Sequence, residues 1–146
     1  MSLRIWVVSC ILLVLLVALA HSQNTSTAPT QAAGFALGPA GTVWGGQHLK
    51  LEVTAEGVNL DFDCATGTIA KAVTVDALGK FQVNGALTRE HGGPVMRDGN
   101  PSAPATYSGA IQGDTLHLVV TSGPSQEPYG EYVLVRGKPG RVLKCK

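Results

Sequence analysis

Four side chains could act together in catalysis or metal binding: His48, Asp61, Asp63 and His91. Two imidazoles and two carboxylates can coordinate a metal ion, or they can pass protons to and from a substrate. Asp61 and Asp63, however, alternate with apolar residues, a pattern typical of the solvated face of a strand. We therefore interpret the two carboxylates as exposed partners in cross-strand charge pairs. An enzyme that uses His48 and Asp63 stays an alternative.

The chain lacks the short motifs that carry the commonest reaction chemistries. It contains no G-x-S-x-G, no H-E-x-x-H, no phosphate-binding loop and no dinucleotide fingerprint. His117 stands alone at an outward position, and Ser108 has no identifiable base. The sequence therefore predicts a non-enzymatic protein with no catalytic residue, no metal and no cofactor.

The N-terminus has the pattern of a secretory signal peptide. Arg4 precedes an apolar run over 5–20, and 18–20 form an A-x-A cleavage site, which predicts a cut between Ala20 and His21 or two residues later. The apolar run is short compared with the roughly 20 residues of a spanning helix. We therefore predict a secreted or periplasmic protein with no stable membrane span after cleavage. An uncleaved anchor is the alternative.

The segment after the signal helix differs in composition from the rest. Residues 21–40 are rich in Ser, Thr, Ala and Gln, which predicts a disordered spacer, and 41–146 are expected to form one β-barrel domain. Without Arg4 the chain carries ten basic and ten acidic residues. A net charge of about zero argues against nucleic acid as a partner.

Two cysteines lie beyond the signal peptide, Cys64 and Cys145, whereas Cys10 lies within it. An even number of cysteines in an exported chain predicts a disulfide. The bridge would close a loop of about 80 residues and stabilise the fold by about 4 kcal/mol in the chain-entropy model. Metal binding is the alternative, but two thiols without a C-x-x-C spacing make a poor site.

Strict alternation over 48–54 and 58–64 predicts an antiparallel hairpin around a Gly-containing turn. Because apolar residues must face apolar residues, the pattern also fixes the register. The expected pairs are Val53 with Val58, Leu51 with Leu60, Leu49 with Phe62, Lys50 with Asp61, and His48 with Asp63. Cys64 continues the inward row, so we expect it in the core.

The later segments continue the β pattern. We expect a second hairpin from 73–76 and 81–87, a long loop over Arg89–Pro104, a hairpin from 106–112 and 116–120, and a second loop over Ser122–Pro128. A last strand would carry Val142, Leu143 and Cys145. The fold class is therefore all-β: an antiparallel meander of about eight strands, closed into a small up-and-down barrel, with a β-sandwich as the alternative.

Several motifs resemble known families. Trp44-Gly45-Gly46-x-His48, Phe62-Asp63-Cys64-Ala65-x-Gly67-x-Ile69, Gly92-Gly93-Pro94-Val95, Tyr107-Ser108-Gly109 and Lys144-Cys145 resemble an uncharacterised family of small exported bacterial β proteins, from which Met96 departs as an insertion. That family implies no activity. The stretch 62–67 with Cys145 also resembles periplasmic β-barrel inhibitors of C-type lysozyme, whose Ser-Gly-x-x-Tyr loop is absent here. This second resemblance implies inhibition of a hydrolase as an alternative function.

The sequence thus favours an exported binding module. Its expected contact surface is the 89–104 loop together with the 122–128 loop, and the candidate binding residues are His91, Arg97, Asp98 and Tyr107. The expected partner is a protein or a small apolar ligand.

Overall fold

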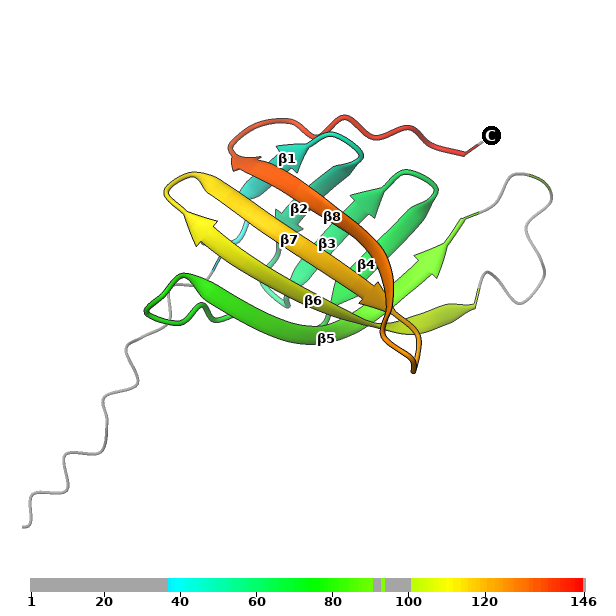
Figure 1. The fold of residues 1–146 in the computed structure, drawn as a ribbon. Coiled ribbons are helices and arrows are strands. Elements are labelled where there is room, and N and C mark those ends of the chain that lie inside the picture. Colours follow the sequence, from blue (N-terminus) through cyan, green and yellow to red (C-terminus); the bar gives the residue numbers. More distant parts are fainter. Residues whose placement is uncertain (1–36, 91–92, 94–100, 146) are drawn as a thin grey trace, which may run out of the picture. The chain divides into compact units, whose positions relative to one another are not determined.

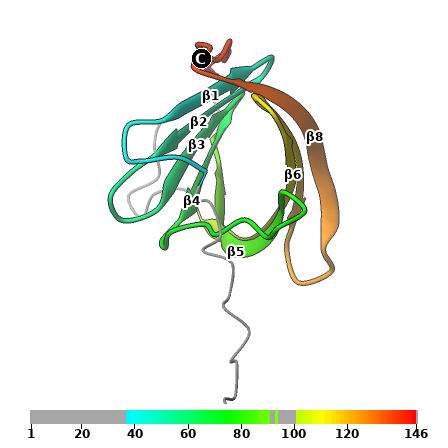
Figure 2. The same ribbon diagram turned by 90° about the vertical axis from the view of Figure 1, so that its left-hand side faces the viewer.

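The computed structural model describes residues 37–90, 93 and 101–145, and in these ranges the chain is all-β. Eight antiparallel strands close into a small barrel (Figures 1 and 2), which confirms the predicted barrel over the sandwich. The strands are β1 Val43–Gly46, β2 Leu49–Val53, β3 Val58–Phe62, β4 Ala65–Ile69, β5 Lys80–Arg89, β6 Ser102–Gln112, β7 Thr115–Ser122 and β8 Glu127–Arg136. Within these ranges, no helix is long and apolar enough to cross a membrane.

Each strand pairs with the next along the chain, and β8 returns to pair with β1. The β2–β3 register is the predicted one, with Val53 opposite Val58, Leu51 opposite Leu60 and Lys50 opposite Asp61. Period-two alternation therefore specified this hairpin correctly, because a slip of one residue would turn its apolar side chains toward water.

The barrel interior is filled by side chains. Trp44, Phe62 and Tyr107 are the largest of the fully buried residues, and aliphatic residues from β2 to β8 surround them. An eight-stranded barrel is just wide enough for such filling. Leu37, which belongs to the segment expected to be a spacer, is also buried, and its carbonyl accepts a hydrogen bond from Trp44 Nε1 at 2.9 Å.

The expected second hairpin is only partly right. Residues 81–87 lie in β5, and the turn from Asp76 to Gly79 forms, with Asp76 Oδ1 accepting the N–H groups of Leu78 and Lys80 and with a positive φ at Gly79. The first strand is wrong, because Val73 and Val75 lie outside the named strands and β5 pairs with β4 and β6. The segment is a loop that buries both valines against the barrel.

The expected last strand is also wrong. The segment Gly137–Cys145, named here the strap, forms only an isolated parallel bridge between Arg141 and Gln47. In Figure 1 it is the red segment that leads from the end of β8 toward the C-terminus.

The strap completes the edge of β1. β8 pairs with β1 at only two positions, Trp44 with Arg136 and Gly45 with Val135. Beyond them Arg141 takes over, since its N–H donates to the Gly46 carbonyl at 2.9 Å and its carbonyl accepts from His48 N–H at 2.8 Å. A side chain at Gly45 would collide with the strap backbone, so glycine is needed at this position.

The strap also makes the two barrel ends different. The open end carries the turns 54–57, 70–79 and 113–114, together with the incoming segment 37–42. The strapped end carries the turns 47–48, 63–64 and 123–126 and the point where β5 leads toward β6. The two loops predicted at 89–104 and 122–128 are shorter than expected, because β5 includes Arg89, β6 begins at Ser102 and β8 begins at Glu127. The described ends of both loops lie at the strapped end.

Candidate functional site

At the strapped end, His48 and Asp63 hold two turns together. His48 Nδ1 lies 2.5 Å from Asp63 Oδ2, as the predicted cross-strand placement requires. Asp63 Oδ1 accepts a hydrogen bond from the Leu143 N–H at 2.7 Å. The Leu143 N–H, followed by His48, lowers the pKa of Asp63 from its ordinary value of 3.8. Because both carboxylate oxygens are engaged, Asp63 acts as a clasp between the turns and the strap.

The expected charge pair between Lys50 and Asp61 is wrong, because Lys50 Nζ lies 2.8 Å from Glu52 Oε2 and Asp61 pairs with the strap. Asp61 Oδ1 lies 3.7 Å from Lys144 Nζ on the strap, and Glu90 Oε1 lies 3.9 Å from the same ammonium group. In the described ranges, no three His, Cys, Asp or Glu side chains gather into a group that could hold a metal ion. His91 lies outside the described residues, so the full set His48, Asp61, Asp63 and His91 stays a prediction.

The predicted disulfide between Cys64 and Cys145 is confirmed, with the two Cα atoms 4.9 Å apart. The expectation that Cys64 continues the inward row is wrong. Cys64 is only partly buried and occupies the β3–β4 turn with a φ of 52°, a left-handed conformation. Its carbonyl accepts the Glu90 N–H at 2.7 Å, which ties the base of the long loop to the same turn.

An aromatic cluster lies beside this clasp. Tyr129 and Tyr132 of β8 each place their ring centroid 5.3 Å from that of the buried Phe62. The guanidinium carbon of Arg89 lies 5.5 Å from the Tyr129 centroid, within cation–π range. Both tyrosines are partly buried, so part of each ring still faces solvent.

Burial keeps these phenols neutral. It raises the pKa of Tyr132 to about 12 and also raises the pKa of Tyr129, against the opposing effect of Arg89. A neutral phenol can donate one hydrogen bond and accept others. The cluster thus offers apolar area, hydroxyl groups and one cation to a ligand.

The two nominated loops meet at their bases. The Gly123 N–H donates to the Pro104 carbonyl at 2.8 Å. In the β7–β8 turn, Gln126 has a φ of 53° and its side-chain oxygen accepts from Thr121 Oγ1 at 2.7 Å. The loops therefore form neighbouring parts of one rim.

The sequence-predicted site residues fall in different places. His91, Arg97 and Asp98 lie outside the described residues, as do Ala20 and His21 at the expected cleavage site. Tyr107 lies within β6 and is fully buried, with its hydroxyl donating to the Ala86 carbonyl at 2.7 Å. Burial raises the pKa of the Tyr107 phenol, and its ring belongs to the core.

Sequence reasoning missed Arg89, Tyr129 and Tyr132 as a group. The register between β7 and β8 shifts at Val120 and Thr121. Such an irregularity re-aims side chains, so β8 presents Tyr129 as well as Tyr132 to Phe62. Strict alternation would place residues three apart on opposite faces, and the sequence signal that could have found the shift is the pair Pro128 and Gly130, residue types that often mark a bulge.

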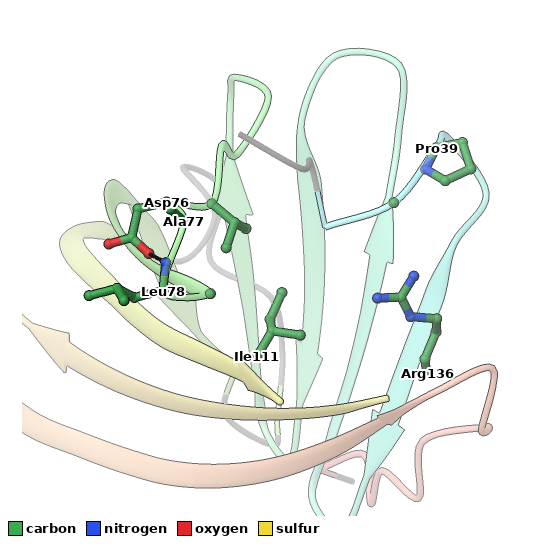
Figure 3. Close-up of a pocket in the computed structure, with 9 residues that line it drawn as sticks. Pro39, Asp76, Ala77, Leu78, Ile111 and Arg136 are labelled. Atoms are coloured by element: carbon green, nitrogen blue, oxygen red, sulfur yellow. Dashed lines mark hydrogen bonds between the residues drawn. The ribbon is translucent and has the colours of Figure 1, made fainter. Parts of the chain in front are cut away.

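The open end carries a hollow of about 810 Å³. It lies between the 75–79 loop and the incoming segment at Gly38 and Pro39, with Ile111 and Arg136 completing the wall (Figure 3). The nominated loops contribute nothing to it among the described residues. The barrel thus has two candidate binding surfaces, one at each end.

Comparison of the chain with protein-family models, curated proteins and solved structures gives no match. The two family resemblances seen in the sequence therefore stay predictions. The geometry of the barrel ends is the basis for the functional conclusion.

Proposed function

We propose that this chain is an exported, non-enzymatic binding module that holds a protein partner with its strapped end. In this proposal the signal peptide is cleaved and the barrel works in the periplasm or outside the cell. The disulfide is consistent with an oxidising compartment of that kind.

The observation that carries the proposal is the distribution of backbone strain. In the described ranges three residues other than glycine have a positive φ, namely His48, Cys64 and Gln126. All three lie in turns of the strapped end. A left-handed conformation costs about 1–2 kcal/mol for such residues. Strain of this kind persists where the surroundings over-determine it, and it clusters at binding sites.

The exposed chemistry of this end suits a protein partner. Tyrosine and arginine are enriched in interface hot spots, because they combine a large apolar area with hydrogen-bonding groups. Tyr129, Tyr132 and Arg89 supply that combination over a rigid base formed by Phe62. Inhibition of an extracytoplasmic hydrolase is a narrower form of the same proposal.

An enzyme based on His48 and Asp63 has less support. Asp63 accepts the Leu143 N–H with one oxygen and pairs with His48 through the other, so the carboxylate already has a structural role in holding the strap. His48 is well exposed, and in the described part of the chain Asp63 is the side-chain hydrogen-bond partner found for it, so no third side chain joins the pair there.

The test is a capture experiment with the exported, disulfide-bonded protein on extracytoplasmic extract, followed by titration of the purified partner. Tyr129→Ala and the milder Arg89→Gln should each lower the affinity for the partner by tenfold or more, since each removes a hot-spot contact. Val133→Ala is the matched control, because Val133 lies on the same strand and is 55% exposed without contacting the cluster.

Thermal unfolding of each variant separates lost binding from lost fold. Equal capture by all variants would overturn the proposal. A turnover that disappears in a folded His48→Ala variant would replace it with the enzyme alternative.

A further inference from the structure

The hollow at the open end has the size of a small-molecule site. Its volume of about 810 Å³ falls in the range of about 300–1,000 Å³ typical of ligand pockets. Its walls are largely apolar, with contributions from Val75, Ala77, Leu78 and Ile111. Binding of an apolar molecule in a hollow of this composition is favourable, because apolar surface on both the ligand and the walls is removed from water.

The loop at 76–79 holds a large apolar side chain in water. Leu78 is 77% exposed. Its position is fixed by Asp76, whose side-chain oxygen accepts the N–H groups of Leu78 at 2.9 Å and Lys80 at 2.7 Å and whose carbonyl accepts the Gly79 N–H at 3.0 Å. The turn is therefore preorganised to present Leu78 to a ligand, which lowers the entropy lost on binding.

The opposite wall supplies one oriented cation. The guanidinium carbon of Arg136 lies 4.6 Å from the ring centroid of the buried Trp44, so the group is held by cation–π contact. Its Nε lies 3.5 Å from Asp114 Oδ1, and in the described part of the chain Asp114 is the ion-pair partner found for it. The Nη groups are therefore left to form a bidentate pair with an incoming carboxylate.

The charges also fix the orientation of a ligand. Figure 3 draws Asp76 and Leu78 on one side of the hollow and Arg136 on the other, with Ile111 between them. A carboxylate head would be repelled by Asp76 and attracted by Arg136. An apolar body would then extend over Ile111 toward Leu78.

We propose that the open-end hollow binds a small apolar molecule with a single carboxylate head, which pairs with Arg136 while its hydrocarbon body covers Ile111 and Leu78. This site is separate from the rim that the proposed function uses. Either proposal can therefore fail without the other.

The test is calorimetric titration of the disulfide-bonded protein with decanoate, at concentrations below micelle formation, and with decanol as the uncharged analogue. Saturable binding of one decanoate is expected, with much weaker binding of decanol. Arg136→Gln should weaken the binding of decanoate by tenfold or more and leave the binding of decanol nearly unchanged, because the charge pair with the guanidinium is the one contact that decanoate alone makes. Leu78→Ser should weaken both ligands.

Two control variants match these changes. Lys138→Gln removes a nearby exposed charge that does not line the hollow, and Val133→Ser replaces an exposed apolar side chain elsewhere. Both should bind like the unaltered protein, and thermal unfolding should show all four variants folded. Absence of saturable binding, equal affinity for decanol, or equal losses in Arg136→Gln and Lys138→Gln would each overturn the proposal.

Discussion

The two ends of this barrel connect similar strands by different physical means. At the open end the chain turns at glycines with positive φ, where no side chain opposes the left-handed conformation: Gly38, Gly41, Gly79, Gly113 and Gly137. At the strapped end Gly123 also has a positive φ, but three turns place residues other than glycine, His48, Cys64 and Gln126, in the same conformation, and hydrogen bonds, the disulfide and the strap hold them there. One end is relaxed and the other is constrained.

The difference follows from how the barrel closes. β8 leaves β1 after two paired positions, so the edge of β1 beyond Gly45 needs another partner. The strap supplies it, but a single bridge at Arg141 is a weak attachment. The Asp63 clasp and the disulfide secure its far end, and the same contacts maintain the strained turns. The contacts that close the barrel are therefore the same contacts that hold the strained turns of the strapped end.

The largest expected effect comes from removing the disulfide. Replacing Cys64 and Cys145 with serine frees a loop that spans 81 residues in sequence. The free energy of unfolding should fall by about 4 kcal/mol, because the unfolded chain regains its loop entropy. Urea unfolding of the oxidised protein and of the double variant measures this difference.

Hydrogen exchange then shows where the loss acts. The His48 and Arg141 amides, which hold the strap to β1, should lose most of their protection against exchange. Amides within β6 and β7 should still exchange only when the whole barrel unfolds. Uniform loss of protection throughout the barrel would show that the two ends do not differ as described.

A smaller effect is expected from the open end. Leu37→Ala removes a buried side chain beside Trp44 and should lower the free energy of unfolding by about 3 kcal/mol, through lost burial and the cavity left behind. Leu143→Ala at the strapped end is the control. Leu143 is 72% exposed and holds the strap through its backbone N–H, so the substitution should change the free energy of unfolding by no more than about 0.5 kcal/mol. Similar losses in both variants would contradict the assignment of Leu37 to the core.

The sequence predicted the parts of the fold that depend on short-range pattern. Alternation gave the β2–β3 register, and cysteine number gave the Cys64–Cys145 pairing. Both rest on rules that act within a hairpin or on composition.

The parts that failed depend on contacts between distant segments. Val142 and Leu143 follow a strand-like pattern, yet this segment becomes a strap because Asp63 captures the Leu143 N–H across 80 residues. Val73 and Val75 alternate like a strand, yet β5, which was expected to pair with them, pairs with β4 and β6. Tyr129 joins the aromatic cluster through a register shift that period-two alternation does not predict, although Pro128 and Gly130 flank it. The candidate site at the strapped end depends on both the strap and the register shift, so the sequence predicted its location but not the residues that form it.

The smallest expected effect tests the clasp through its charge. The pKa of Asp63 is lowered in the folded protein, so its carboxylate adds stability above its ordinary pKa of 3.8, and that stability is lost as the pH falls through the lowered folded value. Asp63→Asn should therefore melt at a lower temperature than the unaltered protein near neutral pH, and the gap should close as the pH falls below 3.8 and through the lowered pKa of Asp63. Asp114→Asn, at a 79% exposed side chain of the open end, is the control. A difference in melting temperature that does not change with pH would mean that the charge of Asp63 contributes nothing to stability. The strap would then be held by the geometry of the Asp63 hydrogen bonds, which asparagine does not reproduce.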